Sequence, residues 1–174
     1  MPSSPPACLL LACQGLTHMP SSPPPCLLLA CQGLTHMPCL PAPGVPGPDG
    51  DSALHLACLY GHLECVKLLL SGGAAADVLN PDDGSTALHD AAAGGYAEIA
   101  ELLLTHSPGL VTVADEDGDT PLHNAARGNH GAMVSLLLVA GSSLTAVNKS
   151  GNSAAGEAEV AEVIELLKVP PAVT

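Results

Sequence analysis

Three histidines, His55, His89 and His123, recur 34 residues apart and are, by type, the side chains best suited to bind a metal or transfer a proton. A histidine titrates near neutral pH and binds zinc through a ring nitrogen at about 2 Å. Each of the three falls in a separate short helix, and packed helices lie about 8 to 10 Å apart. The rings therefore cannot share one metal ion, and we expect them to be structural.

Cysteines near the N-terminus are a second candidate for metal chemistry. Two C-x4-C pairs, Cys8/Cys13 and Cys26/Cys31, are chemically suited to zinc, but their spacing is looser than that of typical zinc ligands. The second pair exists because the first 18 residues are repeated with one change. No Gly-rich phosphate loop, nucleophile elbow or metalloprotease helix is present in the sequence. We therefore expect no metal, no cofactor and no enzymatic activity.

Charge is distributed unevenly over the 174 residues. The sequence has 17 Asp and Glu against 4 Lys and Arg, a net charge of −13, and all of them lie at or beyond Asp49. With two Tyr and no Trp or Phe, the chain lacks both the rings that stack on bases and the cations that neutralise phosphate. Its apolar runs are far shorter than the roughly 20 residues that span a bilayer, and anionic headgroups repel an acidic surface. We expect neither a nucleic acid nor a membrane as partner.

Residues 1–46 are a low-complexity tail that contains an 18-residue tandem repeat and no charged residue. They lack the basic start and long apolar core of a secretory signal, and the arginines of a transit peptide. Two copies this similar indicate recent DNA duplication or an error in the gene model. Segments rich in Pro and Ser around a short Leu cluster cannot bury enough surface to offset the entropy of ordering, so we expect disorder. Residues 41–50 are then a linker.

A second period begins near residue 50 and indicates a folded unit. The strings GDSALH, GSTALH, GDTPLH and GNSAAG begin 34, 34 and 33 residues apart. In the first three units, a hydroxyl residue suited to an N-cap precedes a short Ala-rich helix, and a residue that tolerates a left-handed conformation ends it. A second helix with apolar residues at i, i+3 and i+4 follows. The expected caps are Ser52, Thr86 and Thr120 at the start, and Gly61, Gly95 and Asn129 at the end.

In these strings and their spacing, the chain resembles the ankyrin-repeat family. The resemblance covers residues 47–168 and implies an all-α solenoid of stacked helix-turn-helix units. Its repeats would span about 47–80, 81–114, 115–147 and 148–168, followed by a C-terminal tail at 169–174. In the family, the recurring histidine joins hydrogen bonds to the neighbouring turn. His62 and His130, beyond the caps, are expected at the surface.

The sequence departs from the family pattern after the second helix of a repeat and at the end of the array. Repeats one and two carry a one-residue insertion after their second helix, and Pro108 is expected to end that helix in repeat two. The fourth repeat is truncated. Its last helix is expected to cap the array, with one apolar face and one acidic face. The apolar face would consist of Val160, Val163, Ile164 and Leu167.

Repeat one has no polar cap before it. Leu56, Leu59, Tyr60 and Leu63 include positions that an upstream repeat would cover. Three explanations stay open: the tail folds over this face, the face pairs with another molecule, or the chain is a fragment of a longer array.

The resemblance implies a non-enzymatic protein-interaction module. In this family the turn tips, called fingers, and the first helices of the repeats line a groove that binds protein partners. Carried over by position, the first three fingers are acidic, and Tyr60 is the aromatic anchor of the groove. The candidate partner-binding residues are Asp49, Asp51, Tyr60, Asp82, Asp83, Asp90, Glu116, Asp117, Asp119, Asn124 and Arg127.

Two interpretations of the acidic fingers stay open. Asp is common in tight turns, and the family pattern already places it there. The acid in excess of that pattern favours a partner segment rich in Lys or Arg, attracted by the negative field. Asp90 and Asn124 stand where the family has Leu; for Asp90, a bond to the neighbouring turn or a place at the groove edge is open, and we favour the groove edge.

Location and alternative functions also follow from the resemblance. Ankyrin-like modules are commonly intracellular, so we expect the protein in the cytoplasm or nucleus, with Cys58 and Cys65 as buried thiols. The alternative function is a fragment or regulatory subunit of a larger ankyrin-containing protein or complex whose activity lies elsewhere.

Overall fold

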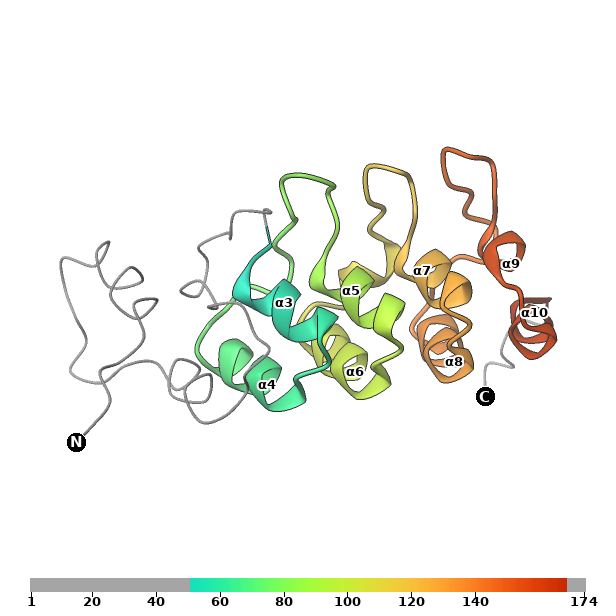
Figure 1. The fold of residues 1–174 in the computed structure, drawn as a ribbon. Coiled ribbons are helices and arrows are strands. Elements are labelled where there is room, and N and C mark those ends of the chain that lie inside the picture. The colour runs from blue at the N-terminus through green and yellow to red at the C-terminus, as the bar shows by residue number, and fades with distance from the viewer. Residues whose placement is uncertain (1–50, 169–174) are drawn as a thin grey trace, which may run out of the picture.

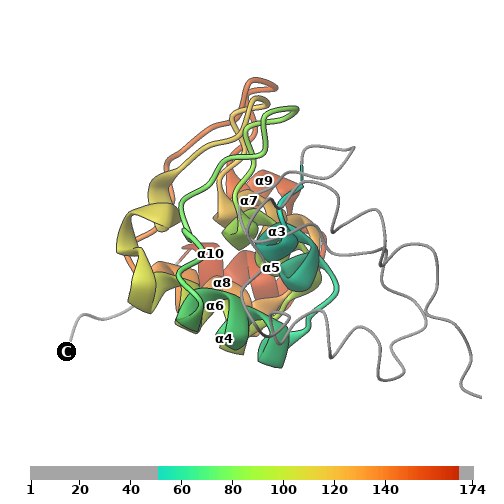
Figure 2. The same ribbon diagram turned by 90° about the vertical axis from the view of Figure 1, so that its left-hand side faces the viewer.

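The computed structural model describes residues 51–168, which form two parallel rows of short helices with loops along one edge (Figure 1). Viewed along the rows, the loops lie at the top, one row of helices beneath them and the second row farther from them (Figure 2). The inner row is α3 (Ala53–Leu59), α5 (Ala87–Gly94), α7 (Pro121–Arg127) and α9 (Ala154–Glu157), and the outer row is α4 (Leu63–Ser71), α6 (Ala97–His106), α8 (Gly131–Val139) and α10 (Ala161–Lys168).

Each inner helix packs against the next, from α3 to α5, α7 and α9, and against the outer helix that follows it. Between residues 51 and 168 the pairing of extended backbone is limited to two isolated bridges, Leu79 with Thr86 and Val147 with Ser153. The expected all-α solenoid is therefore confirmed. The expected disorder of residues 1–46, the linker up to residue 50 and the tail at 169–174 lie outside the described residues.

The inner helices begin at hydroxyl caps, as predicted. Ser52, Thr86 and Thr120 have extended backbones, and each forms a reciprocal capping box with the histidine three residues later. The capping box satisfies backbone N–H groups that have no partner within the helix. The recurring histidine is therefore part of the helix start, which explains its fixed distance from the cap.

Left-handed residues follow the inner helices at the three predicted positions. Gly61 and Gly95 have φ of 71° and 74°, and Asn129 has φ of 56°. Asn129 is the one non-glycine residue of the described part with positive φ. Its side chain has a second use, because Oδ1 accepts the backbone N–H groups of Glu159 at 3.0 Å and Val160 at 2.9 Å. The last inner-to-outer loop is thus fixed to the repeat before it.

In the core between the two rows, α3, α5 and α7 each contribute small residues and one buried leucine, and the outer helices contribute mostly larger side chains. Ala57, Ala91 and Ala125 of the inner helices are fully buried, as are branched or long side chains of the outer helices such as Leu103 and Met133. Methyl side chains allow the inner helices to approach closely, and the larger outer side chains fill the remaining space at high density. This packing holds the inner helices and their loops in register.

Two details of the C-terminal half differ from expectation. α6 stops at His106, just before Pro108 as predicted, because a proline disfavours a helical backbone at the residue that precedes it; the unexpected feature is that Pro108 also begins a 3-10 helix, Pro108–Thr112, that buries Leu110 and Val111. Pro suits this first position because it has no N–H to leave unpaired. In the last repeat Val163 and Leu167 are buried, whereas Val160 is 46% exposed. Val160 precedes the first residue of α10, and its backbone N–H is bonded to Asn129, so its side chain does not join the apolar face of that helix.

Candidate functional site

The loops at the upper edge of Figure 1 are the fingers, and backbone hydrogen bonds close each of them. We define them as residues 80–85, 115–119 and 148–152, numbered second, third and fourth by repeat. The first residue of each finger donates its N–H to the carbonyl of the last, at 2.8, 2.9 and 2.9 Å. Neighbouring fingers are also joined: Glu116 N–H donates to the Asp83 carbonyl at 2.8 Å, and Lys149 N–H to the Asp117 carbonyl at 2.9 Å.

Side-chain acceptors hold the fingers from within. Asp115 Oδ1 accepts the backbone N–H groups of Asp117 and Asp119 at 2.9 and 2.8 Å, and Asn80 and Asn148 accept in the same way in their own fingers. Such Asx turns fix a loop without a neighbouring strand. The carboxylates of Asp82, Asp83, Glu116 and Asp117 remain exposed on the second and third fingers.

The recurring histidines connect successive repeats. The backbone N–H of Thr86 donates to Nδ1 of His89 at 3.1 Å, so Nε2 carries the proton and donates to the Asp119 carbonyl at 3.1 Å. His123 repeats this arrangement with the Asn152 carbonyl at 3.2 Å. The expected bond to the neighbouring turn is confirmed in these two repeats. His55 is buried at the equivalent position, although its Nε2 has no hydrogen bond among residues 51–168.

Burial lowers the pKa of both His55 and His89 below the ordinary value, and nearby carboxylates only partly oppose this effect. These two rings are therefore neutral at neutral pH. A neutral ring with one protonated nitrogen suits the observed pattern, in which one nitrogen accepts and the other donates. Because each ring is part of a helix cap, it is not available for proton transfer.

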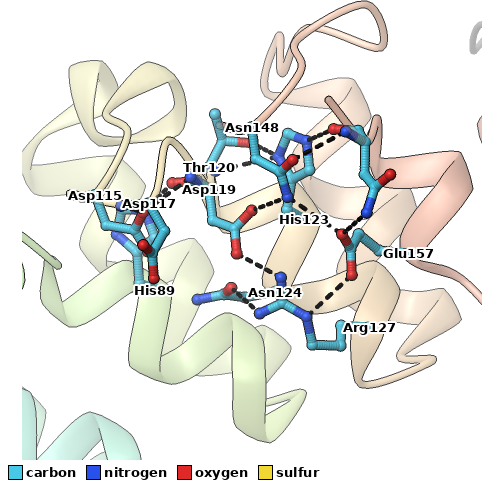
Figure 3. Close-up of polar contacts among 11 residues, drawn as sticks. His89, Asp115, Asp117, Asp119, Thr120, His123, Asn124, Arg127, Asn148 and Glu157 are labelled. Atoms are coloured by element: carbon cyan, nitrogen blue, oxygen red, sulfur yellow. Dashed lines mark hydrogen bonds and ion pairs between the residues drawn. The ribbon is translucent and has the colours of Figure 1, made fainter. Parts of the chain in front are cut away.

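An arginine at the end of α7 connects two carboxylates from different repeats (Figure 3). The Arg127 guanidinium donates to Asp119 Oδ2, and its Nε donates to Glu157 Oε2 at 3.2 Å. Nη1 also donates to Asn124 Oδ1 at 3.4 Å. Asn148 joins the group by donating to both Asp119 Oδ1 and Glu157 Oε1, at 2.8 and 3.2 Å. We call Asp119, Arg127 and Glu157 the arginine triad.

The triad sets the charge state of its members. Burial alone would raise the pKa of Asp119, but the hydrogen bonds from Arg127 and Asn148 bring it below its ordinary value. A hydrogen bond from Asn152 is the main reason for the lowered pKa of Glu157, and the hydrogen bond that Arg127 donates to Asp119 raises the pKa of Arg127. All three groups are therefore ionised at neutral pH, with two negative charges and one positive.

Asp90 on α5 is in the opposite situation. Its Oδ2 is buried and has no hydrogen-bond partner among residues 51–168. Burial, together with the nearby carboxylates of Asp51 and Asp83, raises its pKa to about 8. The Cys58 thiol on α3 lies close enough that Asp90, after burial, contributes to the raised pKa of the thiol. A carboxyl group in this state is mostly protonated at neutral pH and has unused capacity to accept hydrogen bonds.

The predicted partner-binding residues divide by exposure. Tyr60 is 48% exposed and the Arg127 side chain 51%, while Asp51, Asp90 and Asn124 are half-buried. Asp119 does not lie on the open surface of its finger: it is 5% exposed, because its carboxylate turns towards Arg127 and Asn148. The second-finger and third-finger residues Asp82, Asp83, Glu116 and Asp117 are exposed, and Asp49 lies outside the described residues.

Several residues that organise this surface were not singled out from the sequence. Glu157 lies in the degraded fourth repeat, so no motif marks it. His130 lies at the surface, where it is half-buried, and its Nε2 bonds to the Ala93 carbonyl at 3.0 Å. Its ring also fills the space beside Gly95 and Gly128, where a Cβ would come within 2.5 Å of ring atoms. The sequence feature that could have predicted this contact is the pair of glycines, one in each of two adjacent repeats, that leaves room for an aromatic ring.

A row of similar helix pairs, joined through hydrogen bonds between their fingers, is the architecture of a repeat protein. A family model for three copies of the ankyrin repeat matches residues 26–114, and a model for a single ankyrin repeat matches residues 117–149. The chain belongs to the ankyrin-repeat family. The match begins at residue 26, inside the second copy of the 18-residue repeat, which is earlier than the boundary at 47 that the strings predict.

A putative ankyrin repeat protein of Acanthamoeba polyphaga mimivirus is 56% identical over 34 residues, which are 20% of this chain and 3% of that protein. The chain thus matches only a small part of this relative. Ankyrin repeats are generally protein-interaction modules and are typically non-enzymatic. Between residues 51 and 168, every helix is too short or too polar to cross a membrane.

Proposed function

We propose that this chain binds a segment of a protein partner that is rich in Lys or Arg. The second and third fingers of this chain are the main contact surface for that segment. The observation that supports this most directly is the set of exposed carboxylates Asp82, Asp83, Glu116 and Asp117. They lie on adjacent fingers whose backbones are bonded to each other at 2.8 Å, so their negative charges are held together. A preorganised field of this kind raises the association rate with a basic segment.

The positions of the cations support the same proposal. Lys67 and Lys168 pair with acidic residues on their own helices, α4 and α10, at 2.7 and 2.8 Å. Arg127 is engaged in the triad, and Lys149 lies in the fourth finger. The exposed carboxylates of these two fingers, Asp82, Asp83, Glu116 and Asp117, form no ion pair within residues 51–168. A basic partner would therefore meet them without displacing an internal cation.

The proposed location is a reducing compartment, the cytoplasm or the nucleus. Cys58 on α3 and Cys65 on α4 are both free and buried. Thiols in small domains of the secretory pathway are usually oxidised to disulfides, so this state favours an intracellular protein.

The test uses a synthetic peptide of alternating Lys and Gly, with alternating Glu and Gly as the control ligand. The variant Asp82→Asn, Asp83→Asn, Glu116→Gln, Asp117→Asn is compared with the wild type by isothermal calorimetry. We expect wild-type binding to weaken strongly between about 0.1 and 0.5 M salt, because the Debye length falls from about 10 Å to a few Å. The neutralised variant should bind weakly at all salt concentrations.

A matched control removes the same number of negative charges elsewhere. Asp77, Glu98, Glu101 and Glu162 are exposed, form no side-chain bond within residues 51–168, and do not belong to the fingers. Their neutralisation lowers net charge equally but should leave most of the affinity. Equal losses in the two variants would show that only net charge matters, and the finger proposal would then be wrong.

A further inference from the structure

The arginine triad follows a simple positional rule within the repeats. Asp119 immediately precedes the cap Thr120, Arg127 lies seven residues after that cap, and Glu157 lies four residues after the next cap, Ser153. Because each repeat is placed on its neighbour in the same way, residues at these positions meet wherever they occur in the array. The residues at the equivalent positions two repeats earlier can therefore be compared with the triad.

The two carboxylates of the triad recur there, but the arginine does not. Asp51 immediately precedes the cap Ser52, and Asp90 lies four residues after the cap Thr86. The position of Arg127 is taken by Leu59, which ends in methyl groups and has no donor.

The amide donor of the triad has a counterpart too. Asn80 Nδ2 donates to Asp51 Oδ1 at 2.8 Å, as Asn148 Nδ2 donates to Asp119 Oδ1 at 2.8 Å. The negative charge of Asp51 also contributes to the raised pKa of Asp90, as expected if the two carboxyl groups share this position of the repeat. The first and second repeats thus repeat the acidic half of the triad.

The chain has no other cation for this place. All four Lys and Arg residues lie among the described residues, and the N-terminal 48 residues contain none. Three of the four are paired elsewhere, and Lys149 lies at the other end of the array, in the fourth finger. Asp90 Oδ2 is left buried without a hydrogen bond from residues 51–168.

We propose that Asp51 and Asp90 form a seat for an arginine side chain of the partner protein, which completes in trans the triad that Arg127 completes in cis. This inference rests on the proposed function and assigns its specific contact. A planar guanidinium can donate to two carboxylates at once, whereas an ammonium is a compact point charge. Leu59, which is 40% exposed and occupies the position equivalent to Arg127, provides an apolar surface for the alkyl part of that arginine.

Binding of an arginine at the seat must be coupled to the release of a proton from Asp90. The charges of Asp51, before α3, and Asp83, in the second finger, act on Asp90, and Asp90 acts in turn on the Cys58 thiol of α3; none of these groups is a cation. A guanidinium favours the ionised form of Asp90, so binding releases a proton below a pH of about 8, the pKa of the free carboxyl. Affinity for an arginine should therefore rise as the pH is raised towards that value.

The decisive variant is Leu59→Arg, which supplies the arginine from the chain itself, with Leu59→Met as the matched control. The probe is a peptide of alternating Arg and Gly, and the Asp90 carboxyl carbon is followed by NMR through a pH titration. In the wild type, the peptide should shift the Asp90 titration to lower pH. Leu59→Arg should show this shift without peptide and bind the peptide roughly tenfold more weakly, as for loss of a charge-assisted hydrogen bond. Leu59→Met should behave as the wild type.

The outcomes distinguish arginine binding at the seat from binding at the finger carboxylates. If Leu59→Arg and Asp90→Asn bind the peptide as the wild type does, and the peptide leaves the Asp90 titration unchanged, the seat is wrong while finger binding stands. If the wild type does not bind the peptide, the proposed function fails, and the titration of Asp90 in Leu59→Arg still tests whether an arginine fits. An unshifted titration in Leu59→Arg would overturn the seat. Circular dichroism confirms that each variant is folded.

Discussion

Nε2 of His89 lies 3.1 Å from the backbone oxygen of Asp119, so a side chain at the start of one inner helix holds the last residue of the next finger. The same ring accepts the backbone N–H of Thr86 through Nδ1. One residue therefore caps its own helix and positions the neighbouring repeat. This double use accounts for the recurrence of histidine without any catalytic role.

Replacement of His89 by Ala should lower the free energy of unfolding by about 1 to 3 kcal/mol, because it leaves the buried Asp119 carbonyl and Thr86 N–H without these partners. Urea denaturation followed by circular dichroism measures the change. His106→Ala is the control, since His106 is exposed and bonds only within α6; it should change stability by less than about 0.5 kcal/mol. Equal losses would show that the inter-repeat bond is not important.

The contribution of His89 should depend on pH. Its pKa in the folded chain is below the ordinary 6.5 because of burial, so the unfolded chain binds the proton more readily. The stabilisation is therefore complete above pH 6.5 and is lost as the pH falls through the window between 6.5 and the lower folded value. The stability difference between the wild type and His89→Gln, measured at several pH values, should shrink on acidification. A constant difference would contradict the assignment of a neutral ring.

Asp90 should show the opposite dependence. Its folded pKa of about 8 exceeds the ordinary 3.8, so the folded chain retains the proton and stability is lost as the pH rises through this range. Asp90→Asn, which stays neutral and has nearly the same shape, should gain stability over the wild type between pH 5 and 9, on the order of 2 kcal/mol. Thermal unfolding at matched ionic strength measures the gain. Asp77→Asn, at an exposed position that does not contribute to the raised pKa of Asp90, serves as the control and should gain much less.

Asn129 should contribute through its backbone and its side chain separately. Asn129→Gly keeps the left-handed backbone but loses both bonds to the segment before α10, at an expected cost of about 1 kcal/mol. Asn129→Ala also places a less tolerant residue at φ of 56° and should cost about 2 kcal/mol. Hydrogen exchange of α10 amides reports the loss locally. The interpretation is wrong if Asn129→Gly leaves the exchange of the α10 amides unchanged.

Local features of the repeats could be predicted from the sequence because they depend on a few adjacent residues. The caps at Thr86 and Thr120 and the left-handed positions at Gly95 and Asn129 follow from hydroxyl groups and φ preferences within one turn of helix. The helix order and the all-α class follow from the same local pattern repeated at constant spacing.

The environment of the carboxylates could not be predicted in this way. Asp119 and Asp83 are both finger acids, yet Asp119 is buried because Arg127 and Asn148, 8 and 29 residues away, reach it together. Glu157 was hidden because its repeat has lost the usual motif. Whether an acid is buried depends on which residues occupy the matching positions of the adjacent repeat, and this requires the stacked structure.

The backbone bonds between fingers, Glu116 to Asp83 and Lys149 to Asp117, also fix the spacing between successive fingers that any bound ligand must match. Successive repeats are offset by about the 8 to 10 Å that separates packed helices. A peptide in the polyproline II conformation rises about 3.1 Å per residue with three residues per turn, so every third side chain lies on the same face and meets a new finger. In this conformation, a peptide bound across the fingers would favour cations spaced three residues apart over clusters of equal charge.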